Sequence, residues 1–255
     1  MDIHKSAAVG FAAAAEIYAR GRPDYPFETI QWLRETLRLG PGKKVLEVGA
    51  GTGKFIPVLR QTGADLVALE PVEAMRQQLA AAQGDVELLA GTADAIPLPD
   101  GSVDAVVCAQ AFHWFATPAC VASFRRVLAP GGMLGLIWNV RDESVPWVAA
   151  LSAITDPLEG DTPRYRTGAW RRAFPAEGFE FAGAYRVAHA HHGRPEDVIL
   201  GRTLSVSFVA AQPETVRQRI REEINQLITR TPSLAGHDEV DFPYETMMFS
   251  YRKTG

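Results

Sequence analysis

The residues best suited to chemistry follow the first continuous apolar run, where a glycine-rich turn leads from a predicted strand into a predicted helix. Gly49, Gly51 and Gly53 come directly after Val45–Val48. Glycine can adopt positive φ angles and lets a ligand approach the backbone where a Cβ would block it. In doubly wound α/β folds, such a turn at the carboxyl end of a strand binds adenosine-containing ligands. A glycine turn can also be purely structural, so the residues that follow decide between the two.

Two further residues indicate which ligand this turn would hold. The dinucleotide fingerprint GxGxxG needs a third glycine at position 54, where this chain has Lys54. A pyrophosphate is therefore disfavoured. The next predicted strand, Leu66–Leu69, ends on Glu70. A carboxylate there can accept charge-assisted hydrogen bonds from both hydroxyls of a ribose, although the dipole of a following helix would also favour an acid at this position.

The pattern of the chain around these residues predicts an α/β fold. Short apolar runs separated by predicted helices are continuous rather than alternating, as in strands covered on both faces. We therefore expect a Rossmann-like, mostly parallel seven-stranded sheet with helices on both faces. The clearest runs are Val45–Val48, Leu66–Leu69, Val86–Leu89, Val103–Ala109 and Met133–Trp138. Weaker patterns after them predict helices near 146–154, 167–174, 195–208 and 213–228, and extended segments near 179–188 and 242–251.

Composition and charge exclude several classes of partner. The formal net charge is -4 and no Lys/Arg run is interleaved with aromatic residues, so nucleic acid is a poor candidate. No segment approaches 18 apolar residues, so we expect no membrane span and a cytoplasmic protein. Cys108 and Cys120 form no CxxC pair, and His189, His191 and His192 lack a carboxylate or cysteine at metal-ligand spacing. We expect no metal site, and the sequence indicates no oligomeric state.

Four blocks of sequence together resemble the type-11 class I S-adenosylmethionine-dependent methyltransferases. They are the glycine turn, Glu70-Pro71, Gly91–Asp104 and Leu128–Gly132, in that order within residues 41–140. Two further segments, Ala15–Pro23 and Ala109–Phe115, are similar to the subgroup that includes trans-aconitate methyltransferase-like proteins. The resemblance implies S-adenosylmethionine as methyl donor, S-adenosylhomocysteine as product, and a small-molecule acceptor.

The resemblance also implies what individual residues do. The glycines would line the methionine portion of the donor, Glu47 would reach its ammonium directly or through water, and Glu70 would hold the ribose. Many relatives carry an acid in place of Thr92, which puts a contact to the adenine amino group in doubt. Along the chain, the expected cofactor-binding residues are Tyr18, Arg22, Glu47, Gly49, Gly51, Gly53, Glu70, Pro71, Met75, Thr92, Ala93, Ala109, Gln110, His113 and Trp114.

The acceptor side is less defined. Transfer of a methyl group from a sulfonium needs in-line geometry more than a strong acid, so a general base is optional and superfluous for a carboxylate acceptor. His113 is the candidate base, but we favour a positioning role for it. The expected acceptor-binding residues are Arg22, Trp138, Asn139 and Arg141. Arg22 or Arg141 could grip an organic acid that is methylated on oxygen, although Arg141 could instead pair with Asp142.

The expected domain organisation follows from the positions of the cofactor-binding and acceptor-binding residues in the chain. We expect a single domain over residues 1–255, with a helical lid at 1–40, a cofactor-binding core at 41–140, and acceptor-side elements that complete the sheet at 141–255. One alternative is a non-catalytic relative that binds the cofactor to regulate a partner, because fold does not imply activity. The other, less favoured, is an NAD-dependent oxidoreductase.

Overall fold

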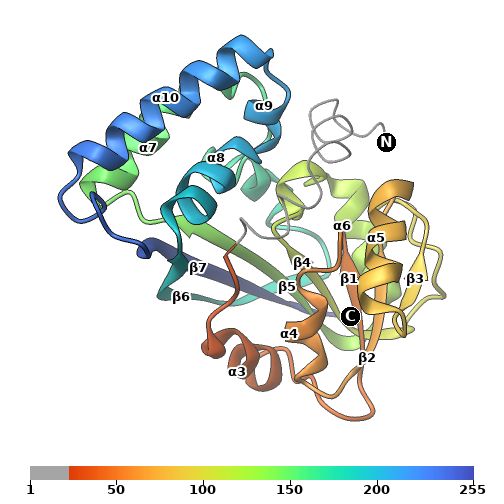
Figure 1. Cartoon of the computed structure of the whole chain (residues 1–255). Helices are drawn as coiled ribbons and strands as arrows, with labels where there is room; N and C mark the ends of the chain where they lie inside the picture. The colour runs from red at the N-terminus through yellow and green to blue at the C-terminus, as the bar shows by residue number, and fades with distance from the viewer. Residues whose placement is uncertain (1–22) are drawn as a thin grey trace.

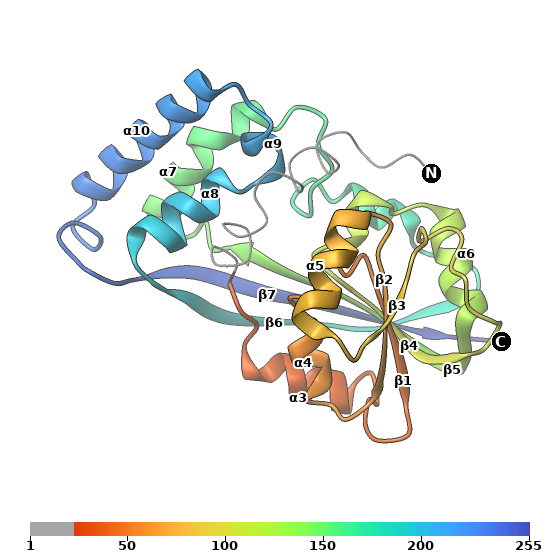
Figure 2. The same ribbon diagram turned by 45° about the vertical axis from the view of Figure 1, so that its right-hand side comes forward.

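A seven-stranded sheet forms the centre of the molecule, with helices on both faces and a helical cap at one end (Figures 1 and 2). The structure is a computed structural model that describes residues 23–255. Its strand order is β3-β2-β1-β4-β5-β7-β6. The strands are β1 (Lys44–Val48), β2 (Asp65–Leu69), β3 (Glu87–Leu89), β4 (Val103–Ala109), β5 (Leu128–Arg141), β6 (Phe179–Gly193) and β7 (Val240–Lys253).

The sheet is mixed. Neighbouring strands from β3 to β5 are parallel, whereas β7 runs antiparallel to both β5 and β6. The expected seven strands are confirmed, with one antiparallel strand inserted next to the edge. Both β5 and β6 are longer than predicted because each continues alongside β7, as far as Arg141 and Gly193 respectively.

The strand order reverses between β1 and β4, which places the ligand edge of the sheet. β1 pairs with β2 on one side and with β4 on the other. In an open α/β sheet, the crevice outside the carboxyl ends of two such strands is the usual ligand site. The glycine turn leaves β1 at this point, and Gln110 leaves β4 beside it.

Helices cover the two faces of the sheet, and alternate residues of each strand pack against them. Val45 packs with Trp32 and Ile56 in the core of one face, whereas Leu46 packs with Phe124 in the core of the other. The helices are α3 (Phe27–Glu35), α4 (Ile56–Arg60), α5 (Glu73–Gln83) and α6 (Pro118–Val127).

The structure describes only part of the predicted lid over residues 1–40, and that part does not form a lid. Residues 1–22, with Tyr18 and Arg22, lie outside the described residues. In α3, Trp32 and Leu33 are buried, and Leu37 beyond the helix lies so close to Gly135 of β5 that a Cβ there would be 2.6 Å from its Cδ1. These buried apolar residues pack against one face of the sheet. The helix α3 therefore belongs to the layer that covers this face and does not cover a ligand site.

The chain after β5 builds most of the cap, seen at the upper left of Figure 1. It contains α7 (Pro146–Thr155), a π-helix (Glu196–Gly201), α8 (Arg202–Leu204), α9 (Ser207–Ala210) and α10 (Glu214–Arg230). The cap has its own apolar core, in which Leu151 and Ile220 pack with Phe242 and Tyr244 of β7. The predicted helices at 146–154 and 213–228 are confirmed.

Two other helix predictions in this part need correction. The segment 167–174 forms only a short 3-10 turn over Ala169–Ala173. The segment 195–208 begins as the π-helix, continues directly into α8 and then breaks before α9, where the Ser205 hydroxyl bonds back to the carbonyl of Arg202 at 2.8 Å and Val206 is extended. Side-chain bonds of this kind compete with helical pairing.

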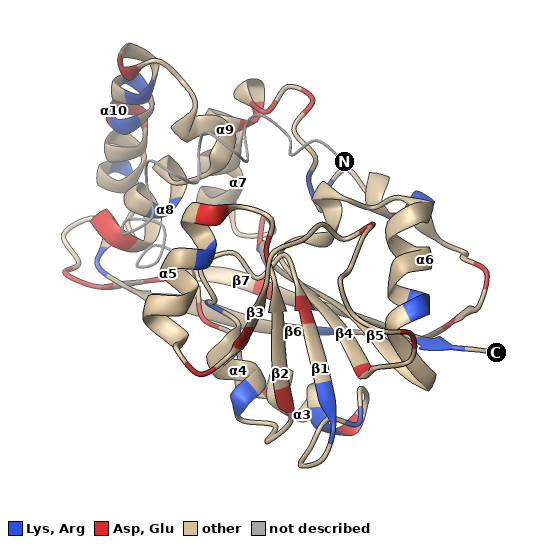
Figure 3. Ribbon diagram, turned by 90° about the vertical axis from the view of Figure 1, so that its right-hand side faces the viewer, with Lys and Arg blue, Asp and Glu red and all other residues tan. Residues whose placement is uncertain are grey.

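Charges of both signs are interspersed along α10 and around the sheet in the view of Figure 3. Within residues 23–255, no helix combines the length and apolarity that crossing a bilayer requires.

Candidate active site

Two cavities of about 190 Å³ each adjoin at the carboxyl ends of the strands. A single water needs roughly 10–15 Å³ on this measure, so each cavity has room for a small organic molecule. The first cavity lies at the glycine turn and Glu70, and the second lies between His113, Arg141 and the cap. Four residues line both: Gln110, Trp114, Asn139 and Arg202. The two spaces therefore meet at a common wall.

The three glycines of the turn have positive φ angles but different surroundings. A Cβ on Gly49 would lie 2.7 Å from the Cβ of Ala111, and one on Gly53 would lie 2.8 Å from Cγ of Leu79. A Cβ on Gly51 would meet nothing nearer than the sulfur of Met75 at 3.9 Å. Gly49 and Gly51 line the first cavity, whereas Gly53 lies outside its lining and lets α5 pack closely. Gly51 is thus the glycine that keeps space open for a ligand.

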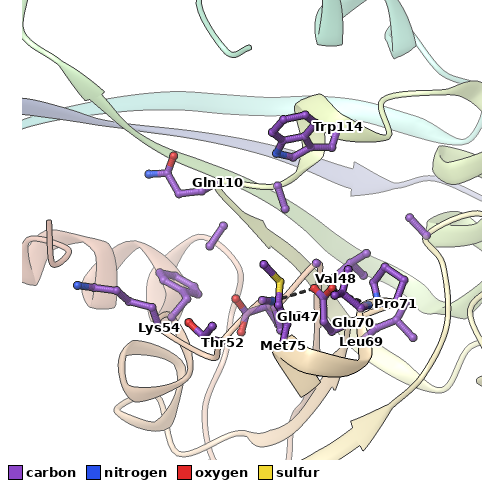
Figure 4. A pocket seen from close by; sticks show the side chains of 18 of the residues that line it. Glu47, Val48, Thr52, Lys54, Leu69, Glu70, Pro71, Met75, Gln110 and Trp114 are labelled. Atoms are coloured by element: carbon purple, nitrogen blue, oxygen red, sulfur yellow. Dashed lines mark hydrogen bonds between the residues drawn. The ribbon is translucent and has the colours of Figure 1, made fainter. Parts of the chain in front are cut away.

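Glu70 is built into the turn. Its two carboxylate oxygens accept the backbone N–H groups of Gly51 and Val72, each at 2.9 Å, and its side chain is 5% exposed. Burial raises the pKa of Glu70, while these two hydrogen bonds oppose that shift. Each oxygen retains a lone pair for a further donor. Figure 4 shows this carboxylate on the cavity side facing Gln110 and Trp114, where a pair of hydroxyls could reach it.

Glu47 is the second acid of the first cavity and is almost completely buried on β1. Its Oε2 has no hydrogen-bond partner within residues 23–255. Burial, followed by the nearby charge of Glu70, raises the pKa of Glu47 to about 8. A buried carboxyl without a partner is costly, and a cationic group in the cavity would relieve that cost.

The side of the cavity expected at the adenine contains an acid that the sequence analysis missed. Pro71, Met75, Thr92 and Ala93 line the cavity as expected, and Asp94 joins them. The hydrogen bond from Thr92 holds the pKa of Asp94 below its usual range. Thr92 stands where an acid was expected, and the acid is found two residues later. The doubt raised by Thr92 could have prompted a search of the neighbouring positions.

The common wall contains one residue, Gln110, with an unusual backbone conformation. Gln110 has a φ of 60° and is one of two non-glycine residues with positive φ within residues 23–255. Its N–H donates to the carbonyl of Ile137 at 2.8 Å, which holds the turn against β5. In Figure 4 its side chain lies on the same side of the cavity as Trp114 but points away from it. Strained conformations of this kind cluster at functional sites. Ala109, which precedes it, lines the first cavity as expected.

His113 lies in the second cavity and outside the lining of the first. Its Nδ1 accepts the indole N–H of Trp138 at 3.0 Å. This bond uses the Nδ1 lone pair and fixes the ring between two tryptophans. The contact favours the positioning role over that of a base acting through Nδ1.

The second cavity contains the expected acceptor residues Trp138, Asn139 and Arg141. Arg141 is partly buried, and burial lowers its pKa to about 10. Its Nη2 donates to the hydroxyl of Thr203 at 3.2 Å, and its guanidinium lies 5.6 Å from the ring centre of Phe242. The alternative pairing with Asp142 is wrong, because that carboxylate instead accepts from the N–H and hydroxyl of Ser144.

Other residues of the two cavities were not predicted from sequence. Lys54, considered only as a missing glycine, lines the first cavity and forms an ion pair with Asp24 at 3.4 Å. Arg202 reaches both cavities from the cap. No group of three or more His, Cys, Asp or Glu side chains within residues 23–255 is arranged to hold a metal ion.

Comparison with known proteins gives two kinds of match. A family model described as a methyltransferase domain matches residues 46–136. An uncharacterized methyltransferase-like protein of Schizosaccharomyces pombe is 35% identical over 239 residues, covering 92% of each chain. An uncharacterized methyltransferase of Mycobacterium tuberculosis is 37% identical over 239 residues, covering 94% of this chain and 93% of the relative. These relatives are similar over both the core and the cap.

Solved structures add the fold. A provisionally assigned type II methyltransferase of Anaeromyxobacter dehalogenans has a TM-score of 0.63 and 25% identity, covering 91% of this chain and 97% of its own. The [4+2]-cyclase SpnF has a TM-score of 0.53 and 19% identity, covering 92% and 84%. Because a cyclase has the same fold, the fold alone does not fix the reaction. The sequence relatives are named as methyltransferases, which supports methyl transfer over the oxidoreductase alternative.

The first cavity fits S-adenosylmethionine on its own chemistry. Glu70 offers lone pairs beside the glycine turn, Oε2 of Glu47 lacks a partner, and Gly51 leaves space that a side chain would fill. These features suit hydroxyl, ammonium and backbone-packed portions of one ligand. Together with the family model and the relatives, they show that the chain belongs to the class I S-adenosylmethionine-dependent methyltransferases.

Proposed function

We propose that this enzyme methylates a carboxylate oxygen of a small organic acid bound in the second cavity. The observation that carries the proposal is Arg141, a partly buried guanidinium in that cavity that forms no ion pair with a carboxylate among residues 23–255. A guanidinium presents a planar fork that matches a carboxylate. The similarity of Ala15–Pro23 and Ala109–Phe115 to trans-aconitate methyltransferase-like proteins supports the same class of acceptor.

The donor side of the proposal uses the first cavity. Glu70 would accept the ribose hydroxyls, Glu47 would pair with the ammonium, and Pro71 and Met75 would pack on the adenine. Thr92 and Ala93 would lie at the adenine edge, with Asp94 as the acceptor of its amino group. Gly49 and Gly51 would line the methionine portion. These roles agree with the lining of the cavity.

The common wall would bring the two substrates together. When bound, S-adenosylmethionine supplies an electrophilic methyl group whose leaving group is a neutral thioether. A carboxylate is already ionised at neutral pH, so no protein group has to remove a proton. The task of Gln110, Trp114 and Asn139 is then to hold the acceptor oxygen in line and to exclude water, and orientation of this kind can supply most of the acceleration. His113 would keep Trp138 in place.

The test is the chemical form of the product. The enzyme is incubated with methyl-labelled donor and metabolite pools separated by charge, and labelled products are treated with mild alkali. A carboxyl methyl ester releases labelled methanol, whereas N-methyl, C-methyl and aryl ether products do not. We expect the label in the anionic pool and in an alkali-labile product. An alkali-stable product would contradict the proposal and leave the methyltransferase assignment intact.

Variants of Arg141 connect the product to the cavity. Arg141→Met should raise the KM of the acidic acceptor at least tenfold, because a charged hydrogen-bonding partner contributes roughly 1.5–3 kcal/mol. It should leave the Kd of S-adenosylhomocysteine nearly unchanged. Arg219→Met is the matched control, since Arg219 lies on α10 with its side chain 65% exposed. Wild-type KM values in Arg141→Met would remove this residue from the acceptor site.

A further inference from the structure

Arg202 is a buried cation at the junction of the two cavities. It begins α8 directly after the π-helix, and it lines both spaces. The residue is 9% exposed, and its Nε and Nη1 have no hydrogen-bond partner within residues 23–255. The cap thus delivers a guanidinium to the point where the donor and the acceptor have to meet.

The surroundings make this placement costly for the protein alone. Arg141 is close enough that the charge of Arg202 helps burial to lower its pKa. The charge of Arg202 also acts on His191. Burial lowers the pKa of His191 to about 4, and the charges of Lys54 and Arg202 contribute to this shift. A buried guanidinium with two unpartnered nitrogens, near the charge of Arg141, destabilises the folded protein. Positions that violate packing rules in this way are expected at functional sites.

The missing partner is an anion that can accept from several donors. The Nε–H points to the edge of the planar group that Nε shares with Nη2, whereas Nη1 lies on the other side, next to Cδ. A carboxylate at the Nε–Nη2 edge would accept two parallel hydrogen bonds. Two acids of the first cavity, Glu70 and Asp94, would repel such a group from their own side. A carboxylate is therefore drawn to the junction, beside Asn139 and Gln110.

We propose that Arg202 binds a ligand carboxylate at the junction of the two cavities. Two ligands can supply it: the amino-acid end of the cofactor, or the acidic acceptor. The first source rests only on the assignment of the first cavity to the cofactor, whereas the second rests on the proposed function.

Ligand truncation separates the two sources. S-adenosylhomocysteine carries the amino-acid carboxylate, and methylthioadenosine lacks it. Calorimetry with both ligands is compared between wild type and Arg202→Met. If the cofactor supplies the carboxylate, the variant binds S-adenosylhomocysteine at least tenfold more weakly and methylthioadenosine normally. Arg202→Lys should recover part of the loss, because it restores the charge without the fork. Arg219→Met controls for the loss of one positive charge in the cap.

The acceptor source is tested on protein saturated with S-adenosylhomocysteine. Butyrate and its neutral counterpart butyramide serve as probes, with binding followed by ligand-observed NMR. If the acceptor supplies the carboxylate, Arg202→Met loses butyrate binding and retains whatever binding butyramide shows, while both adenosyl ligands bind normally. A failure of the ester assay combined with selective loss of S-adenosylhomocysteine affinity would refute the proposed function and uphold this role of Arg202.

Stability of the ligand-free protein distinguishes ligand binding from a structural role. Because Arg202 has no partner for two of its donors, Arg202→Met should melt at the same temperature as wild type or higher. A lower melting temperature, with equal losses for S-adenosylhomocysteine and methylthioadenosine, would overturn the proposal. So would unchanged binding of both S-adenosylhomocysteine and butyrate.

Discussion

The two cavities are assembled in different ways. The first takes most of its lining from short segments that each follow a strand or begin a helix: 47–55, 69–72, 91–94 and 109–115. The second is lined by residues between 138 and 143, at and just beyond the carboxyl end of β5. It is also lined by cap segments that are distant in sequence, such as 152–156, 164–166 and 202–208. Parallel strands place their carboxyl ends together by topology, whereas the cap positions its residues through an apolar core of its own.

Their charged residues differ in proportion. The first cavity is lined by three acids, Glu47, Glu70 and Asp94, together with Lys54 and Arg202. The second is lined by four arginines and two acids: Arg141, Arg164, Arg166, Arg202, Glu143 and Asp156. The comparison teaches that the first cavity is built by local turns of the sheet and the second largely by the cap, which under the proposed function assigns donor recognition to the turns and acceptor recognition to the cap. A change confined to one cavity should therefore affect one ligand.

The largest expected effect comes from Gly51→Val. A Cβ there would have no protein atom nearer than 3.9 Å, so the valine side chain would extend into ligand space and S-adenosylhomocysteine binding should weaken by more than a hundredfold. The positive φ adds strain of roughly 1–2 kcal/mol. Gly42→Val is the matched control, since Gly42 has a φ of 78° and nothing within 4 Å of an added Cβ. Calorimetry checks both variants. A Kd close to wild type for Gly51→Val would place the ligand elsewhere.

A smaller effect is expected from Glu70→Ala. The variant loses an acceptor for the ribose and leaves the amides of Gly51 and Val72 without theirs. Donor affinity should fall at least tenfold. Glu73→Ala, which removes an acid that is 67% exposed on α5, should bind normally. If Glu70→Ala changes the KM of the acceptor as strongly as it changes the affinity for the donor, the two cavities do not bind separate ligands.

The last effect is on stability instead of ligand binding, and it concerns Glu47. The folded protein keeps the proton of this carboxyl up to a pH of about 8, whereas the unfolded chain releases it near 4.5. The unfolded state therefore binds fewer protons between these values, and this group lowers the free energy of unfolding as pH rises through that window. Arg141 keeps its charge there, because its pKa is about 10.

Glu47→Gln should remove this dependence. Denaturant unfolding should find the variant similar to wild type near pH 4.5 and more stable at pH 9, with a flatter profile between. A variant that is less stable than wild type at pH 9 would show that Glu47 is satisfied in a way that its unpaired Oε2 does not indicate.

The sequence predicted the first cavity better than the second, because the first is built from local turns and the second from segments that are distant in sequence. Glu70 and the glycine turn could be located because one strand, one turn and one helix determine their positions, and the predicted Val103–Ala109 matches β4. Arg202 could not be found, because no local spacing relates it to Gln110 or Asn139. It reaches them through the packing of a helix that breaks at Ser205 and Val206, and the apolar pattern of 195–208 predicted no break.

Individual residues follow the same line. Gly53 was expected at the ligand, and the structure places it outside the lining of the first cavity and against Leu79 of α5. The pairing of Arg141 with Asp142 was plausible from adjacency alone. Neighbouring residues at the end of a strand point in opposite directions, and Asp142 instead caps the turn at Ser144.

A crystal structure of the complex with S-adenosylhomocysteine tests most directly the claim that the methyl group passes between two adjoining cavities. The account predicts ribose hydroxyls on the carboxylate of Glu70 and the thioether sulfur at the wall formed by Gln110, Trp114, Asn139 and Arg202, open to the second cavity. A ligand bound in the reverse direction, or a sulfur enclosed on the side of the glycine turn away from that wall, would contradict it.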